Sequence, residues 1–277
     1  MNPILPLPDL LAAVERITRD AGRVVMAIYA TDFAVQGKAD ESPVTLADQQ
    51  AEAVILAGLR TLTPGVPIVA EEAVAAGQAP AADALAAIAA GGRFWLVDPL
   101  DGTREFVARN GEFTVNIALI EHGRPVLGVV LAPALGAVAG GSGGQLYAGI
   151  KGQGAWLEDA TGRRAIGCRV VPDEGLTVLA SRSHGDAPAL DAFLARYLAG
   201  RRVARLANAG SSLKLCWLAA GQADVYPRLG RTMEWDIAAG HAVLAAAGGS
   251  VCRVDNGAPL TYGKPGFENP QFVAAGR

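Results

Sequence analysis

The chain has 277 residues, of which 51% are hydrophobic and 18% are charged. This composition supplies enough apolar surface for a large core and excludes an intrinsically disordered chain. The formal net charge of −3, without a basic stripe, excludes the electrostatic surface that a nucleic-acid-binding protein needs. We therefore expect no nucleic-acid partner, and an anionic ligand must be held by a few local groups or by metal ions.

The cysteines and the N-terminal residues indicate the compartment. The three cysteines, Cys168, Cys216 and Cys252, are widely spaced and form no Cys-x-x-Cys pair, so a reducing environment is expected. The N-terminal sequence MNPILPLPDLL has no basic segment or long apolar run, and no stretch supplies about 20 uninterrupted apolar residues. We expect a soluble, cytoplasmic protein with no integral membrane segment.

Two helices followed by strands are expected in the first half of the chain. Apolar residues over 9–30 recur at helical spacing after Asp9, a suitable N-cap. Bracketing prolines predict a second helix over 45–62, with Asp48 in its first turn. The segment 73–92 predicts a surface connection with a short helix. Four β-rich runs predict a central sheet, at residues 66–70, 93–98, 113–120 and 125–132.

The pattern changes near residue 175, after which strands and helices alternate. The expected elements are a strand at LTVLAS, helices near 187–199 and 211–220, a strand at DVYPR and a helix over 234–247. This order predicts a second α/β layer. We expect an α/β (α+β) fold with two subdomains, 1–174 carrying most metal ligands and 175–277 completing the substrate site.

The most informative stretch is WLVDPLDGTRE, where an apolar strand leads into Asp98 and Asp101. Two carboxylates so close repel each other unless a cation lies between them, and oxygen ligands favour Mg²⁺ or Mn²⁺. Pro99 fixes the turn, and Gly102 allows backbone N–H groups to approach an anion. The alternative is that both aspartates only cap a turn, because Asp-Pro and Asp-Gly are ordinary turn sequences.

Two further acidic signals support a metal site. Glu71 and Glu72 directly follow the 66–70 strand, and Asp236 lies at the start of an apolar helix. Each signal alone is typical of a helix N-terminus, where acidic residues face the helix dipole. The chain has no Walker phosphate loop.

Together these motifs resemble those of the inositol monophosphatase family of lithium-sensitive, metal-dependent phosphatases. The resemblance covers nearly the whole chain and rests on SPVTLADQQAE (42–52), EE (71–72), LVDPLDGTREF (96–106) and WDIAAGHAVLAAAGG (235–249). It is closer still to the bacterial 3'(2'),5'-bisphosphate nucleotidase branch, also called the CysQ type. Residues 94–121, 179–184 and 210–228 carry that second resemblance.

The resemblance implies a layered αβαβα fold of the inositol monophosphatase/fructose-1,6-bisphosphatase type, with the site between two subdomains. It implies two to three Mg²⁺ ions, the third held loosely near Glu71. Glu71, Asp98 and the main-chain carbonyl of Leu100 would hold the first ion. Asp98, Asp101 and Asp236 would hold the second.

The same resemblance assigns the catalytic and phosphate-binding groups. Thr103 and Asp48 would orient and deprotonate a metal-bound water for in-line attack on phosphorus. The N–H groups of Gly102 and Thr103 would bind the phosphate. Lys38 matches a family lysine near the metal site.

The substrate contacts follow from the nucleotidase branch. Lys214 and Arg228 would bind the second phosphate of a nucleotide, and His184 and Ser211 would line the nucleoside pocket. The alternatives are that His184 is a surface or capping residue and that Arg228 is solvated. His122 and His241 are expected to be structural.

The predicted reaction is the Mg²⁺-dependent hydrolysis of 3'-phosphoadenosine 5'-phosphate to AMP and phosphate, as in sulfate assimilation. Leu229 stands seven residues before Asp236, where inositol-specific members usually carry a glutamate. An inositol or histidinol phosphatase remains an alternative, and so does a catalytically silent protein that binds a nucleotide or metal. A homodimer is one candidate assembly, because dimers are frequent among relatives, but no interface stripe in the sequence distinguishes it from other oligomeric states.

Overall fold

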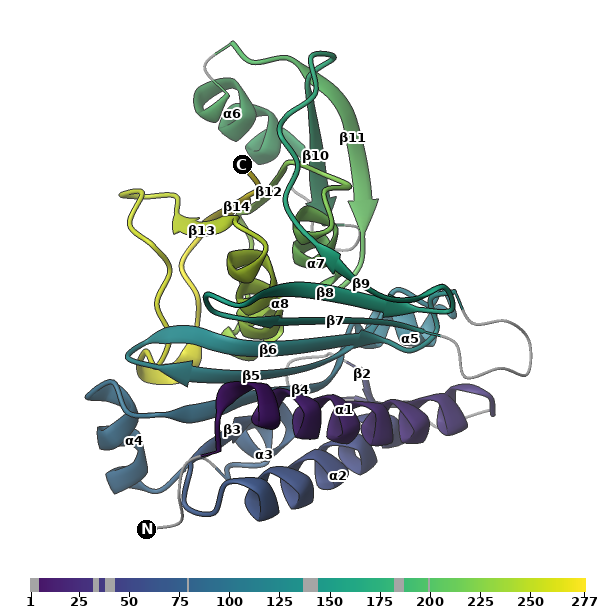
Figure 1. Ribbon diagram of the computed structural model, residues 1–277, viewed down its shortest axis with the longest axis vertical. Helices are drawn as coiled ribbons and strands as arrows, with labels where there is room; N and C mark the ends of the chain where they lie inside the picture. The colour runs from purple at the N-terminus through teal and green to yellow at the C-terminus, as the bar shows by residue number, and fades with distance from the viewer. Residues whose placement is uncertain are drawn as a thin grey trace.

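A computed structural model of the chain describes residues 5–31, 35–37, 43–78, 80–136, 144–181, 187–198 and 200–277. Its helices and sheets form five layers (Figure 1). These are α1 (Leu7–Tyr29) with α2 (Leu46–Leu62), a seven-stranded sheet, α7 (Leu213–Ala219) with α8 (Glu234–Ala246), a five-stranded sheet, and α6 (Ala187–Tyr197). The order confirms the expected αβαβα architecture.

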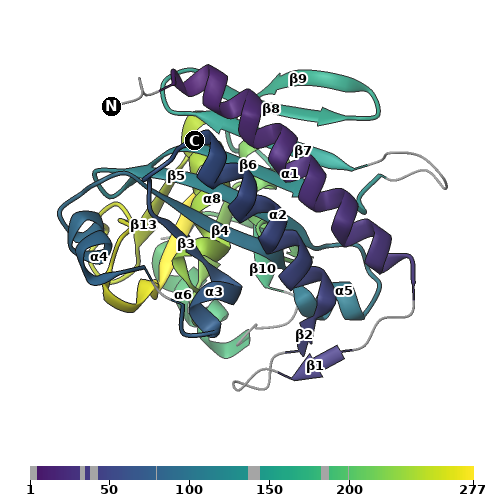
Figure 2. The same cartoon turned by 90° about the horizontal axis from the view of Figure 1, so that it is seen from below.

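The outer helices α1 and α2 lie side by side across the seven-stranded sheet (Figure 2). The expectation that Asp9 caps α1 is wrong. The helix begins two residues earlier, and Pro6 occupies the cap position without a side-chain cap bond. Pro8 suits the first turn because its fixed φ is helical and it has no N–H to satisfy. Asp9 therefore lies inside the first turn, and Asp48 lies in the first turn of α2 as expected.

The seven-stranded sheet is buried on both faces, which explains its apolar runs. Trp95 and Val97 pack toward α1 and α2, whereas Phe94 and Leu96 pack in the core that contains α7 and α8. The first strand pair is parallel and the other neighbours are antiparallel. In spatial order the strands are β3 (Ile68–Ala70), β4 (Phe94–Asp101), β5 (Thr114–Glu121), β6 (Arg124–Ala132), β7 (Gln145–Ile150), β8 (Gly154–Asp159) and β9 (Gly162–Ile166).

The five-stranded sheet is built from residues 176–275 and is also mixed. Its order is β11 (Val203–Ala209), β10 (Leu176–Ser181), β12 (Val225–Arg228), β14 (Phe272–Ala275) and β13 (Ser250–Arg253). The smaller elements are β1 (Val35–Gly37), β2 (Pro43–Thr45), α3 (Glu71–Ala75), α4 (Ala82–Ala89), α5 (Thr103–Val107) and the 3₁₀ turn Pro265–Phe267. Among the described helices, none combines the length and apolar character needed to cross a membrane.

Two glycines let α8 approach the seven-stranded sheet closely. A Cβ at Gly128 would lie 2.4 Å from the carbonyl oxygen of Ala239, and one at Gly149 would lie 2.8 Å from Cα of Val243. The expected boundary at 174/175 falls between β9 and β10, yet α8 packs against the first sheet. The two-subdomain division therefore remains a prediction.

Candidate metal centre and active site

The acidic cluster forms where β3 and β4 run side by side. These strands are parallel and Ala70 pairs with Val97, so the next residues, Glu71 and Asp98, are neighbours. Asp236 reaches them from the first turn of α8. Glu71, Asp98 and Asp236 each offer a carboxylate oxygen, and the three oxygens lie within 4.8 Å of one another. This spacing suits a shared cation.

Burial and mutual repulsion make this cluster electrostatically costly. Burial raises the pKa of Asp98 well above its ordinary value, and the charges of Glu71 and Asp101 raise it further. Burial and then Asp101 raise the pKa of Asp236 in the same way. A divalent cation would relieve this repulsion, and a set of hard oxygen ligands fits Mg²⁺. The residues therefore fit the expected metal.

The strand that carries Asp98 differs from expectation. We expected it to end at Asp98 with a turn at Pro99, but β4 continues to Asp101 through a register shift opposite β5. An irregularity of this kind accommodates Pro99, which cannot donate a ladder hydrogen bond. Asp98 still makes a local backbone contact within this irregular strand, because its Oδ1 accepts the N–H of Leu100 at 3.0 Å.

Asp101 accepts hydrogen bonds from the neighbouring strand β5 and from the residue before α7. Its Oδ2 accepts the N–H of Ser212 at 2.6 Å and the Nδ2 group of Asn116 at 3.4 Å. Burial raises the pKa of Asp101 to about 6, although the charge of Lys214 and the Ser212 N–H oppose the shift. Among the described residues, the cluster with metal-ligand spacing does not include Asp101. Its role in a second metal site remains a prediction.

The expected catalytic and phosphate-binding residues surround the cluster. Gly102 has a φ of +94° and precedes Thr103, the first residue of α5. Thr103 Oγ1 donates to the carbonyl of Leu100 at 3.5 Å. Asp48 is 1% exposed, and its charge contributes to the raised pKa of Asp98. The structure thus brings Asp48 near the cluster, while its action as a base remains a prediction.

The two expected phosphate-binding cations are both buried. Lys214 Nζ donates to the carbonyls of Ala209 (3.1 Å) and Ser211 (2.7 Å), and burial lowers the pKa of Lys214 to about 8. Arg228 is only 9% exposed, so the solvated alternative for it is wrong. Its Nη2 donates to the carbonyl of Arg231 at 2.7 Å. Both cations act electrostatically on the acidic residues, Lys214 on Asp101 and Arg228 on Asp236.

The remaining residues singled out in the sequence are Ser211, His184, Lys38 and His241. Ser211 has a φ of +46°, and its buried Oγ has no hydrogen-bond partner within the part of the chain that the structure describes. His184 and Lys38 lie outside the described residues. His241 is buried, with its Nδ1 2.8 Å from the hydroxyl of Tyr262, as expected for a structural residue.

Three residues near the site were not predicted from the sequence. Glu52 is buried on α2 and accepts two backbone hydrogen bonds from the start of α3. Asn116 lies opposite Asp98 on β5, and Ser212 Oγ donates to the carbonyl of Asp236 at 2.5 Å. A polar residue inside an apolar strand was the available signal for Asn116. The signal for Glu52 was its position four residues after Asp48.

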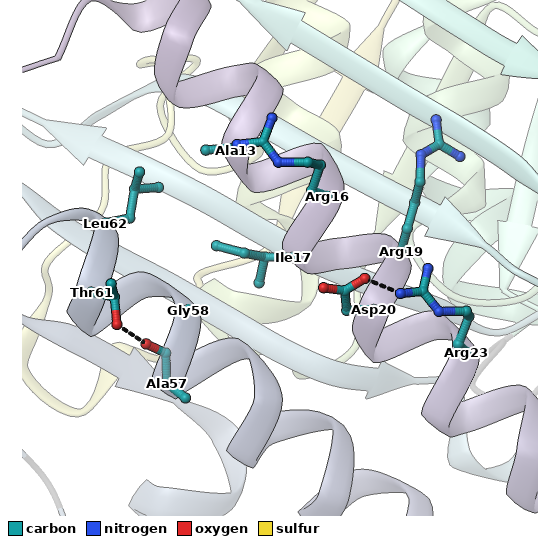
Figure 3. A pocket seen from close by; sticks show the side chains of 10 residues that line it. All are labelled: Ala13, Arg16, Ile17, Arg19, Asp20, Arg23, Ala57, Gly58, Thr61 and Leu62. Carbon is teal, nitrogen blue, oxygen red and sulfur yellow. Dashed lines mark hydrogen bonds and ion pairs between the residues drawn. The ribbon is translucent and has the colours of Figure 1, made fainter.

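A separate surface groove of about 710 Å³ lies between α1 and α2 (Figure 3). Arg16, Arg19 and Arg23 line it from α1, and Arg23 pairs with Asp20. None of the predicted site residues lines this groove, so it is separate from the acidic cluster.

Known proteins match almost the entire chain. The inositol monophosphatase family model matches residues 7–275. The 3'(2'),5'-bisphosphate nucleotidase CysQ of Escherichia coli O157:H7 is 45% identical over 266 residues, covering 95% of this chain and 98% of that protein. The protein of the same name from Buchnera aphidicola is 36% identical over 271 residues, covering 96% and 93%.

Solved structures agree with the sequence comparisons. The crystal structure of CysQ from Bacteroides thetaiotaomicron has a TM-score of 0.79 and 34% identity, covering 97% of each chain. The inositol monophosphatase from Anabaena sp. PCC 7120 has a TM-score of 0.71 and 25% identity, covering 97% of this chain and 91% of that one. The chain belongs to the inositol monophosphatase family.

Proposed function

We propose that this chain is a Mg²⁺-dependent phosphomonoesterase that hydrolyses 3'-phosphoadenosine 5'-phosphate to AMP and phosphate. The observation that carries the proposal is the cluster of Glu71, Asp98 and Asp236, in which Asp98 is buried, beside the buried cations Lys214 and Arg228. The 45% identity to a protein named 3'(2'),5'-bisphosphate nucleotidase supports this substrate class.

The acidic residues supply the ligands of the metal. Glu71, Asp98 and Asp236 would hold Mg²⁺, with Asp101 and the Leu100 carbonyl as the further ligands proposed for a second ion. When bound, Mg²⁺ lowers the pKa of a coordinated water and stabilises negative charge on the phosphate and the leaving oxygen. The number of ions, two to three, is part of the proposal.

The chain's own residues then position the reactants. Asp48 is buried near Asp98, so its carboxylate can accept a proton from the attacking water, and the Thr103 hydroxyl can hold that water in line. The Thr103 N–H is in the first turn of α5 and has no intrahelical acceptor, so it can donate to a phosphate oxygen together with the Gly102 N–H.

A second phosphate needs positive charge that an acidic protein must supply locally. Arg228 offers a planar guanidinium that can form paired hydrogen bonds with a phosphate. Lys214 adds charge, although its ammonium also holds two main-chain carbonyls. Leu229 lacks the carboxylate that would favour inositol. Ser211, and His184 beyond the described residues, are the proposed nucleoside contacts.

The location of the enzyme is also part of the proposal. Cys168, Cys216 and Cys252 are free thiols in the structure, which supports a reducing, cytoplasmic setting. A role in clearing the nucleotide by-product of sulfate assimilation follows from the proposed substrate. A homodimer is proposed too, and light scattering on the purified protein tests it.

A phosphate-release assay tests the substrate assignment. The purified chain is given 3'-phosphoadenosine 5'-phosphate, AMP, inositol 1-phosphate and histidinol phosphate, each with Mg²⁺ and with EDTA. We expect kcat/KM for the bisphosphate to exceed that for inositol 1-phosphate by at least about tenfold, or about 1.4 kcal/mol. Equal or greater activity on inositol 1-phosphate would refute the substrate assignment. Absence of Mg²⁺-dependent activity on all four would favour a silent binding protein.

A further inference from the structure

Glu52 joins two helices at the edge of the acidic cluster. It lies on α2 and is 5% exposed. Its Oε2 accepts the N–H of Glu72 at 2.8 Å, and its Oε1 accepts the N–H of Ala73 at 2.9 Å. Ala70, which occupies the N-cap position just before α3, makes no side-chain hydrogen bond to that helix. The N–H groups at the start of this five-residue helix are therefore bound by a carboxylate from another helix.

This contact constrains the backbone of a metal-ligand candidate. Glu71 is the first residue of α3, immediately before the two residues that Glu52 binds. On its other side, Ala70 is paired with Val97 in the parallel β3–β4 ladder. The backbone of Glu71 is thus fixed from both directions, by the sheet and by Glu52.

The same helix also carries the candidate base. Asp48 and Glu52 are four residues apart on α2, so they lie on one face of the helix, and both are buried. Asp48 acts electrostatically on Asp98, while Glu52 binds α3. One helix face therefore carries both the candidate base and the side chain that binds the start of α3.

We propose that Glu52 is a positioning residue that ties α3 to α2 and so fixes Glu71 relative to Asp48. The inference rests on the metal site of the proposed function. A carboxylate is required because two N–H groups converge on the side chain, and glutamine offers only one acceptor oxygen and would place an NH₂ group against the other N–H. Burying this carboxylate is unfavourable, since burial raises the pKa of Glu52 to about 6 even though both hydrogen bonds oppose the shift.

A matched variant separates this role from ordinary stabilisation. Asp224 is also buried, and its Oδ2 accepts the Thr177 N–H at 2.7 Å. It precedes β12, at the opposite end of that strand from Arg228. Asp224→Asn therefore replaces another buried carboxylate, one that binds a backbone N–H and the Arg169 guanidinium, away from the acidic cluster.

The test measures the Kd for Mn²⁺ without substrate, using the decrease of the EPR signal of free Mn²⁺ as the readout of binding. The Tm of each variant in EDTA measures stability separately. We expect Glu52→Gln to weaken Mn²⁺ binding by about tenfold or more, which corresponds to about 1.4 kcal/mol. Asp224→Asn should lower the Tm while its Kd for Mn²⁺ stays within about twofold of wild type. If Glu52→Gln does not fold, Glu52→Asp, which keeps both oxygens on a shorter stem, is compared in the same way and should also bind Mn²⁺ more weakly than wild type.

A Kd within about twofold of wild type for the folded Glu52 variant, with a lowered Tm, would overturn the proposal and leave Glu52 as a purely stabilising residue. The result does not depend on the substrate, because none is present. If wild-type protein itself binds no Mn²⁺, the proposed function fails as well, so the two failures are distinguishable.

Discussion

Replacing Asp98 by Asn should stabilise the metal-free protein while removing its response to Mg²⁺. Two unit charges 4.8 Å apart repel by about 3.5 kcal/mol at an effective dielectric constant of about 20. Proton uptake already relieves part of this repulsion, because the pKa of Asp98 is raised. We therefore expect a net gain of about 1 to 3 kcal/mol at pH 8, which raises the Tm of a chain of this length by about 2 to 5 °C. The asparagine keeps an Oδ1 to accept the Leu100 N–H.

The assay is thermal unfolding at pH 8 in EDTA and in saturating Mg²⁺. Asp224→Asn is the control, because Asp224 is buried beside a cation, with bonds to Arg169 of 2.9 and 2.8 Å. The same substitution should therefore destabilise the protein there, by about 1 to 3 kcal/mol. The reasoning is refuted if Asp98→Asn lowers the Tm in EDTA as much as the control does. An unchanged Mg²⁺ response in Asp98→Asn would refute it too.

Three further outcomes follow from the site. The rise in Tm caused by Mg²⁺ should be smaller at pH 6 than at pH 8. The folded-state pKa values of Asp98, Asp101 and Asp236 are raised, so the metal-free fold gains stability as pH falls through those values. Protons also compete with Mg²⁺ for the same carboxylates. An equal rise at both pH values would contradict this. Arg228→Ala should lower kcat/KM for 3'-phosphoadenosine 5'-phosphate by about ten- to a hundredfold and barely affect inositol 1-phosphate, since a charge-assisted contact contributes about 1.5 to 3 kcal/mol. An equal loss on both substrates would assign Arg228 to the fold or the metal site. LiCl in the millimolar range should inhibit at limiting Mg²⁺, because Li⁺ resembles Mg²⁺ in size but carries half the charge; unchanged activity would argue against Asp101 and Asp236 as ligands.

The strands and helices with strong apolar patterns could be predicted from the sequence. The first four strands of the large sheet and helices α1, α2 and α8 were expected within a few residues of their observed bounds. Strands β9 and β11 were not expected, because their residues are largely exposed and so form no apolar face that would indicate a strand. These segments are strands because they pair with neighbouring strands. Their strand character depends on the sheet around them.

The site shows the same division between local and distant information. Asp98 and Asp236 stand in short motifs, and the parallel pairing of β3 with β4 brings Glu71 beside Asp98. The bond between Asp101, at the end of β4, and the N–H of Ser212, just before α7, joins residues 111 positions apart, so no local pattern predicts it.

Glu52 illustrates why the supporting residues were missed. A glutamate on an amphipathic helix ordinarily faces solvent. Its burial depends on α3 packing against α2, which only the tertiary structure reveals.

The most direct test of the central claim is the stoichiometric conversion of 3'-phosphoadenosine 5'-phosphate to AMP and phosphate by the wild-type protein and by Asp98→Asn. We predict that EDTA abolishes turnover, that added Mg²⁺ restores it, and that Asp98→Asn loses nearly all of it in saturating Mg²⁺. Turnover that persists in EDTA would contradict the account. So would an Asp98→Asn variant that keeps more than about a tenth of wild-type turnover, a loss of less than about 1.4 kcal/mol of transition-state stabilisation.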